Sequence, residues 1–346
     1  MKRFAVFVVF LVLLLLFVCF PHTVSNGAAA GLMLWFKIVI PALLPFLLFA
    51  VFFFKLGVTD FVSSLLYPVF HALYGISKNG CYPVLIGFLS GYPLGAKMTA
   101  DTYKDGRIGH DEAQYILGFC NNASPMFLLE YVGIQCTSSK IPCLFWVCVT
   151  LSAFLGARVD LFLMSVKRAV KNKDKQDALF GGTSLQCAEL ESLTKKNDKN
   201  CRAQLKDMAD DKKNLNKRST GIIDVLDESI TDCCETLVKI GGYMILFSVL
   251  LAVLQQLLPL SGDNGCFLAS ILEITTGANA MKQCALPLLL RDSVLCGFCA
   301  FGGLSSTAQT ASVVRGSGLS MVSYLFVKVR QAVLAAVIYY LLRQYF

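Results

Sequence analysis

The sequence predicts an all-α protein that crosses a membrane several times. Of its 346 residues, 55% are hydrophobic and only 16% are charged, and its mean hydropathy is +0.62. Soluble domains carry about 25% charged residues. The apolar residues also occur in runs close to the roughly 20 helical residues that span a bilayer. This pattern excludes a soluble enzyme, a secreted disulfide scaffold and a free nucleic-acid-binding protein, despite the net charge of +8.

The fourteen cysteines do not indicate disulfides or a metal site. Most of them lie inside apolar runs, where cysteine behaves as a small hydrophobic residue. Cys296 and Cys299 have CxxC spacing, but no second pair of cysteine or histidine ligands follows at the spacing of a zinc site. We therefore expect reduced thiols in the core, with no metal and no cofactor.

An apolar run near the start predicts the first membrane span. Lys2 and Arg3 precede seventeen apolar residues. A signal peptide has the same pattern, and the small residues Ala28 to Ala30 are compatible with cleavage. We expect an uncleaved transmembrane helix over residues 1–21, with cleavage as the alternative.

Residues 22–166 form the first of two predicted gate-like repeats. Its elements are a span, an interfacial helix, a broken hairpin, an interrupted span and an uninterrupted span, over residues 37–54, 61–76, 81–100, 111–133 and 141–166. Neighbouring helices must accommodate Pro41 and Pro45 in the first span. The second segment mixes serine, tyrosine and histidine with apolar residues, a composition typical of the membrane interface.

The segment GFLSGYPLGAK, residues 87–97, is too rich in glycine and proline for a straight spanning helix. Such residues leave backbone groups unpaired, which a bilayer tolerates only against protein or a water-filled cavity. We therefore expect a re-entrant hairpin that enters and leaves by the same face. The next span is interrupted in a similar way at CNNASP, residues 120–125.

A polar segment over residues 167–220 separates the two repeats. Residues 167–218 hold 14 lysines and arginines and 8 acidic residues, with no apolar periodicity. This composition predicts a disordered loop. The basic residues that directly follow the preceding span place the loop in the cytoplasm.

Residues 221–346 form the second predicted repeat. Its elements are an amphipathic lead-in, a span, a weak apolar segment, a broken hairpin and a last span, over residues 221–237, 239–258, 267–290, 302–310 and 319–342. The hairpin, GGLSSTAQT, is again too polar and glycine-rich to face lipid. The weak segment is interrupted at residues 273–277.

The order of elements and a few identities relate the two halves. The segment WFKI at residues 35–38 matches LVKI at residues 237–240, and glycines and alanines of the two hairpins align at a constant offset. The first half crosses the membrane three times, so the second half begins on the opposite face and the repeats are inverted. The positive-inside rule agrees, with Lys104 and Arg107 inside and Arg315 among the few basic residues outside. Inverted repeats with broken helices are typical of secondary transporters.

Polar residues at the predicted breaks are the candidate substrate-binding residues. They are Lys97, Ser90, Gly91, Tyr92, Asn121, Asn122, Ser124, Ser305, Ser306, Thr307 and Gln309, with Glu273 and Thr275 along the pathway. A lysine at membrane depth is costly and usually faces a cavity or a partner, so Lys97 is expected to meet an anionic substrate. The alternatives are that Lys97 extends to the interface or pairs with Asp101.

Each other group also has a structural alternative. The amides and hydroxyls of residues 121–124 either bind substrate or an ion, or close the helix break by interhelical hydrogen bonds. The backbone N–H groups beside residues 305–310 either hold a carboxylate or belong to a stripe of small packing residues. Glu130 is a candidate structural ion-pair partner of Lys328 or Arg330.

Four motifs resemble the YlbJ family of sporulation integral membrane proteins. They are SGYPLGAK at residues 90–97, DGRI at 105–108, FCNNASPMF at 119–127 and the segment from Trp35 to Phe46 with its two prolines. That family belongs to the gate-domain, or nucleoside-recognition, group and is similar in architecture to concentrative nucleoside transporters. The resemblance implies a role in endospore formation, moving dipicolinate across the outer forespore membrane.

Taken together, we expect a non-enzymatic, multi-pass protein of a bacterial cell membrane that transports a small organic anion by alternating access. Its expected partners are the lipid bilayer and the anion, with no nucleic acid; a homo-oligomer and a coupling sodium ion or proton stay open. A non-transporting scaffold for the spore cortex or coat, with the polar loop as its binding segment, and a nucleoside carrier are the alternatives.

Overall fold

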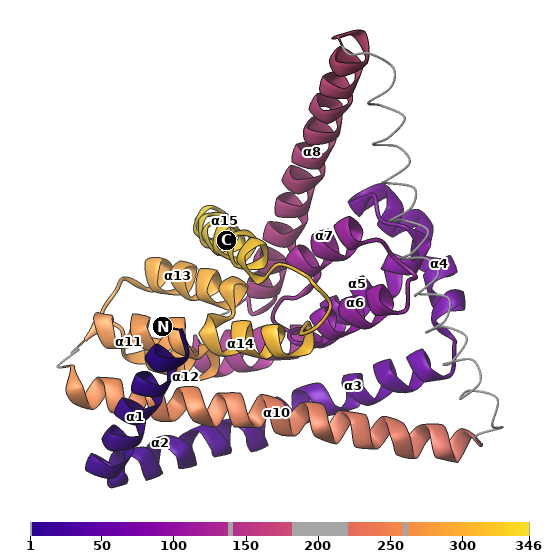
Figure 1. Cartoon of the computed structure of the whole chain (residues 1–346). Helices are drawn as coiled ribbons and strands as arrows, with labels where there is room; N and C mark the ends of the chain where they lie inside the picture. The colour runs from indigo at the N-terminus through magenta and orange to yellow at the C-terminus, as the bar shows by residue number, and fades with distance from the viewer. Residues whose placement is uncertain (1, 138–140, 182–220, 259–261, 346) are drawn as a thin grey trace.

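In the computed structural model, residues 2–137, 141–181, 221–258 and 262–345 are described, and every regular element in them is helical (Figure 1). Five helical segments within these residues are long and apolar enough to cross a membrane: Pro21–Lys55, Cys143–Val166, Ile222–Leu257, Leu288–Val313 and Met321–Arg343. The prediction of an all-α, multi-pass membrane protein is confirmed.

The first candidate span begins earlier than expected. After α1 (Lys2–Cys19), α2 (Pro21–Leu34) continues through a π-helical segment, η1 (Trp35–Val39), into α3 (Ile40–Lys55). Prolines lack the N–H that would pair with a carbonyl one turn earlier. The wider π turn, in which Ile40 N–H donates to Trp35 O, lies directly before Pro41 and carries the helix into the proline-containing segment.

The helix α10 (Ile222–Leu257) packs along α2 and α3 to form one side of the molecule (Figure 1). The predicted lead-in and span of the second half are therefore one continuous helix. Trp35 Nε1 donates to Leu237 O over 3.0 Å. A Cβ atom on Gly241 would lie 2.6 Å from the Trp35 ring, so glycine permits this approach. The matched segments WFKI and LVKI thus lie against each other.

The predicted hairpin of the first half is a pair of helices that fold back on each other. It follows α4 (Thr59–Tyr74) and a short turn, η2 (Lys78–Gly80), and consists of α5 (Cys81–Ser90) and α6 (Leu94–Lys104). A Cβ atom on Gly95 would lie 2.8 Å from Gly87 Cα, which shows how closely the two helices approach. Gly91, with φ +78°, makes the turn.

The interrupted span and the span after it also occur where expected. The helix α7 (His110–Cys120) ends before non-helical residues 121–124, and the chain continues as a π-helix, η3 (Phe127–Cys136). The next helix, α8 (Cys143–Gly181), extends beyond the predicted boundary at Val166 and protrudes from the rest of the molecule (Figure 1). Residues 182–220 of the predicted polar loop lie outside the described residues.

The second half differs from the prediction in which element folds back. A Cβ atom on Gly277 would lie 2.3 Å from Ser270 Cα, so α11 (Asp263–Leu272) and α12 (Ile274–Ala280) are the close pair. A short turn, η4 (Met281–Gln283), leads to α13 (Leu288–Phe301) and α14 (Gly303–Val313), which together form a candidate span broken at Gly302. The prediction of a hairpin at residues 302–310 is therefore wrong, because the left-handed backbone of Gly302 interrupts a helix that continues across the molecule.

With this assignment, the two halves present their elements in the same order. Each has a long apolar helix, a folded-back pair, a broken helix and a final long helix; α15 (Met321–Arg343) corresponds to α8. The corresponding boundaries, Cys81 with Asp263, Cys120 with Phe301 and Cys143 with Met321, are separated by nearly constant chain lengths. The α4 helix is the extra element of the first half.

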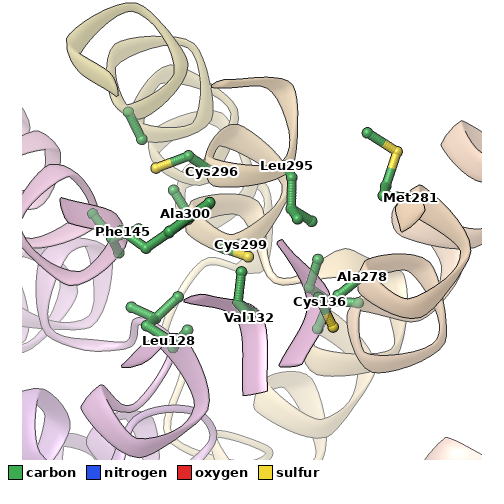
Figure 2. Packing of buried hydrophobic residues seen from close by; sticks show 14 of the residues in the cluster. Leu128, Val132, Cys136, Phe145, Ala278, Met281, Leu295, Cys296, Cys299 and Ala300 are labelled. Atoms are coloured by element: carbon green, nitrogen blue, oxygen red, sulfur yellow. The ribbon is translucent and has the colours of Figure 1, made fainter. Parts of the chain in front are cut away.

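The buried cysteines pack as hydrophobic residues, as Figure 2 shows for Cys136, Cys296 and Cys299. Their cluster joins η3 and α8 of the first half to α12, α13 and α15 of the second. The rings of Phe145 and Tyr339 lie 4.6 Å apart at its edge. Burial of this shared apolar surface stabilises the contact between the halves.

The two broken regions end on the same side of the molecule. Lys104 Nζ, at the end of α6, donates to the carbonyl of Arg315, just after α14, over 3.4 Å. The expectation that these residues face opposite sides of the membrane is therefore wrong. Met321, at the start of α15, follows Arg315 closely in the chain, so this candidate span begins on the Lys104 side.

We predict that labels will separate these two sides. Gly109 and Asn264 are exposed, and a Cβ on Gly109 meets no atom within 4 Å. In a cysteine-depleted protein, Gly109→Cys should react with an impermeant maleimide only from the cytoplasm, whereas Asn264→Cys and Tyr345→Cys should react only from outside. Reaction of all three from one side would contradict the inverted arrangement.

Candidate functional site

The turn of the first folded-back pair lies on the break of the following helix. Tyr92 N–H donates to Asn122 O over 2.7 Å. A Cβ atom on Gly91 would lie 2.6 Å from Ser124 N, so a larger residue does not fit between the two backbones. Backbone groups released by the break after α7 are thus paired with the turn between α5 and α6, as a low-dielectric interior requires.

The second half repeats this contact. A Cβ atom on Gly303 would lie 3.3 Å from both Leu272 O and Ile274 N, the residues on either side of the α11–α12 turn. The turn between α11 and α12 therefore lies on the break between α13 and α14. In both halves, the folded-back pair contacts the break of the next helix.

Contacts between the two halves bring all four interruptions together. A Cβ atom on Gly302 would lie 3.2 Å from Tyr92 Cε1, so the ring of Tyr92 lies beside the break of the other half. Asn121 Nδ2 donates to Thr310 Oγ1 of α14 over 2.9 Å and to Tyr324 Oη of α15 over 2.8 Å. Residues far apart in the sequence thus form one polar junction.

A cavity of about 520 Å³, including the open space at its mouth, lies at this junction. We call it the inner cavity. Eight of its lining residues are polar: Ser90, Tyr92, Ser124, Glu273, Thr275, Ser305, Ser306 and Gln309. The opposite wall is apolar and comes from η1, α3 and α10, with Ile38, Leu43 and Met244 among its residues. All eight polar residues belong to the set predicted from the sequence.

One of these polar groups has no partner of its own. Ser90 is 1% exposed, and its Oγ forms no hydrogen bond with any of the described residues. Leaving a buried hydroxyl unpaired costs about 1–3 kcal/mol. A ligand in the inner cavity is one way to satisfy this hydroxyl.

Glu273, predicted to lie along the pathway, adds an acidic group to the lining of the inner cavity. Its carboxylate caps α12, accepting hydrogen bonds from the N–H groups of Thr275 and Thr276 at 3.0 and 2.6 Å and from Thr276 Oγ1 at 2.7 Å. These donors and the start of α12 stabilise its negative charge.

Lys97 lines a different cavity from the one predicted. This second cavity, of about 840 Å³ with its open space, is strongly charged and is called the vestibule here. Its charged residues are Lys97, Asp101, Lys104, Asp232, Glu235, Lys239 and Arg315. Lys97 Nζ donates to Thr236 Oγ1 over 3.2 Å, and Lys239 pairs with Glu235 at 2.5 Å. Gln309 and Ile240 line both cavities, so the vestibule adjoins the inner cavity.

The remaining predicted residues support the junction instead of lining the inner cavity. Gly91 forms the turn, and Thr307 Oγ1 donates to Gly303 O over 3.0 Å. Asn121 and Asn122 are buried, and both accept hydrogen bonds from Lys328. Asn121 and Asn122 thus form the interhelical hydrogen bonds at the α7 break that were the structural alternative to substrate binding.

Lys328 is the buried cation that we did not include among the predicted site residues. It is 0% exposed, and Nζ donates to Asn121 O, Asn122 Oδ1 and Gln331 Oε1 at 3.0, 2.9 and 3.2 Å. Its position within an apolar span was the available signal. The ion pair expected with Glu130 is wrong: Arg330 pairs with Asp160 at 2.6 Å.

Comparison with curated proteins gives a match to the sporulation integral membrane protein YlbJ of Bacillus subtilis (strain 168). The two are 25% identical over 349 residues, which cover 93% of this chain and 78% of that protein. This similarity supports a YlbJ-type family assignment. No family model matches the chain, and no solved structure matches it.

The fit of the first turn against the break after α7 predicts that two glycines will respond unequally to substitution. Gly91 and Gly106 have similar φ angles of +78° and +70°, but a Cβ on Gly106 meets no atom within 4 Å. Both Gly91→Ala and Gly106→Ala add backbone strain. Gly91→Ala also pushes the turn away from the break after α7, and the Gly91 ψ of −166° lies in a backbone region that essentially only glycine adopts. Together these effects should make Gly91→Ala about 1–3 kcal/mol more costly than Gly106→Ala. Thermal unfolding in detergent should show the lower midpoint for Gly91→Ala; equal midpoints would contradict this packing.

Proposed function

We propose that the chain transports a small organic anion, dipicolinate, across a bacterial membrane by alternating access between two inverted repeats. The observation that carries this proposal is the meeting of four helix interruptions around the inner cavity. Discontinuous helices near the midplane are typical of substrate sites in secondary transporters. A scaffold that only binds other proteins would not require interrupted helices in both halves.

The chemistry of the inner cavity supports a ligand with carboxylates and a flat ring. Ser90 and Ser305 provide hydroxyl donors, and the backbone N–H groups at the start of α14 provide more. Glu273 is a carboxylate already held by N–H groups at a helix start, which illustrates this kind of binding. Tyr92 and the apolar wall offer surfaces against which an aromatic ring can pack.

The vestibule supports a route for an anion toward this cavity. Lys97, Lys104 and Arg315 contribute positive charge to its walls, and positive charge raises the local concentration of an anion. Lys239 is already paired with Glu235. The acidic residues of the vestibule limit this attraction, so we assign Lys97 to steering the substrate at the entrance of the inner cavity.

The physiological setting in the proposal comes from the similar protein. That protein is named as a sporulation integral membrane protein. A membrane role in spore formation therefore fits the chain, and we place its action in the outer membrane around the forespore. Dipicolinate has two carboxylates on a flat aromatic ring, the features to which the inner cavity is suited.

Uptake by proteoliposomes tests the proposal directly. The purified protein should take up dipicolinate, and Lys97→Ala should lower uptake about tenfold at low substrate, equivalent to about 1.4 kcal/mol. Lys97→Arg should restore part of the loss, because it keeps the charge but not the compact ammonium. Lys282→Ala, at an exposed lysine, is the matched control and should transport normally. Uptake of nucleosides instead of dipicolinate would favour the nucleoside carrier.

Deletion of residues 182–220 separates transport from scaffolding. A transporter should retain dipicolinate uptake without this segment, because the four breaks are formed by residues 90–93, 121–124, 272–274 and 302–303. In spore-forming cells that lack the unmodified protein, expression of the protein without residues 182–220 should also restore dipicolinate accumulation in the spore. A deletion that abolishes spore formation, together with a silent Lys97→Ala, would favour the scaffold.

A further inference from the structure

Lys328 lies in the interior without an acidic hydrogen-bond partner. Its side chain is 0% exposed, and its three acceptors are the Asn121 carbonyl, Asn122 Oδ1 and Gln331 Oε1. Among the described residues, no carboxylate forms an ion pair with it. By contrast, Arg330, two residues later, is bound by Asp160. A buried ammonium held only by neutral oxygens is costly, which marks intramembrane lysines as functional candidates.

The break after α7 creates the site that holds this ammonium. The helix ends at Cys120, so no N–H group of a following helical turn donates to the Asn121 carbonyl. This carbonyl instead accepts a hydrogen bond from Lys328. The C-terminal end of a helix carries partial negative charge, which favours a cation there. Asn121 Oδ1 is a further buried oxygen without a partner among the described residues. The site therefore offers one more acceptor than the ammonium uses.

The same two asparagines connect the ammonium to the moving parts expected of a transporter. Asn122 O accepts from Tyr92 N–H, and Tyr92 lines the inner cavity beside Gly302. Asn121 Nδ2 donates to Thr310 in α14, the helix that provides Ser305 and Ser306 of the inner cavity. A change in the charge of Lys328 would thus alter the hydrogen bonds that Asn121 and Asn122 make with both the α5–α6 turn and α14.

We propose that Lys328 carries the proton that is cotransported with the anion. In the protonated state, the ammonium fills the oxygen site and adds positive charge close to the anion. After the anion leaves, the ammonium gives its proton to water entering from that side and becomes a neutral amine. The amine then takes a proton from the other side in the next cycle. This proposal rests on the transport function above, and it makes the proton the coupling ion.

Lys328 also argues against sodium as the coupling ion. The oxygens released by a broken helix are typical sodium ligands in such transporters. Here the Lys328 ammonium already uses the Asn121 and Asn122 oxygens. Unlike arginine, lysine can lose its proton in a buried site.

The other titratable groups packed around Lys328 are few among the described residues. From α7, the Cys120 thiol interacts with it electrostatically and contacts Thr99 Oγ1 at 3.6 Å. On its own helix, the Tyr324 hydroxyl is bound by Asn121. On α8, Asp160 is engaged by Arg330. On the cavity side of the junction, the Glu273 carboxylate is held by Thr275 and Thr276. Lys328 is therefore the fully enclosed lysine of this junction, and no carboxylate among the described residues forms an ion pair with it.

The first experiment uses the unmodified protein. Proteoliposomes containing an entrapped pH dye are given a dipicolinate gradient, with the membrane potential clamped at zero by potassium and valinomycin. Dipicolinate entry should carry protons inward and acidify the lumen. Conversely, an imposed pH gradient of about one unit should support about tenfold accumulation for one proton per anion. Transport that moves no protons, or that depends on sodium, would overturn the proposal.

The second experiment uses Lys328→Arg, which keeps its positive charge but does not release its proton, and Lys328→Gln, which is neutral. Lys282→Gln, at an exposed lysine, is the matched control. Exchange of labelled for unlabelled dipicolinate needs no net proton movement, so Lys328→Arg should retain it. Lys328→Gln is fixed in the neutral state that follows release of the anion and should lose it. Gradient-driven accumulation should be lost in both variants and kept in Lys282→Gln. Accumulation by either folded Lys328 variant, exchange by Lys328→Gln at the unmodified rate, or loss of exchange in folded Lys328→Arg would overturn the proposal. If the unmodified protein neither exchanges nor accumulates dipicolinate, the transport function itself fails.

Discussion

Backbone hydrogen bonding in a low-dielectric interior is the constraint on which the rest of this structure depends. Each interrupted helix releases N–H and C=O groups that lipid cannot satisfy. The turn at Gly91 pairs with the break at Asn122, and the turn before Ile274 lies against the break at Gly303. Four interruptions are therefore tolerated because they lie against one another. A polar centre inside an apolar protein follows directly.

The sequence predicted much of this arrangement because glycine, proline and polar residues in apolar runs have a strong physical meaning. The breaks at residues 91–93 and 121–124 and the polar lining of the inner cavity were all predictable from local composition. Which element folds back in the second half was not. Periodicity does not reveal that Gly277 approaches Ser270, since this contact depends on how α11 and α12 pack.

The partners of charged residues were harder to predict for a similar reason. Lys97 and Lys328 are both lysines in apolar surroundings, and sequence reasoning favoured Lys97. The structure gives Lys97 a place on the wall of an open cavity and encloses Lys328 completely. Burial depends on helices distant in the sequence, such as α7 against α15. Composition identifies costly charges, but only the fold distinguishes an entrance from an interior.

The linings of the two cavities meet at shared residues. Gln309 and Ile240 face both spaces, and Gln309 Nε2 is held by Ser305 Oγ at 3.2 Å. A partition of side chains opens by rotamer changes, which are far faster than helix movements. The junction of turns and breaks involves backbone and needs a larger displacement. In the proposed transport cycle, this conformation faces the vestibule, and the side chains of Gln309 and Ile240 lie between that cavity and the inner cavity.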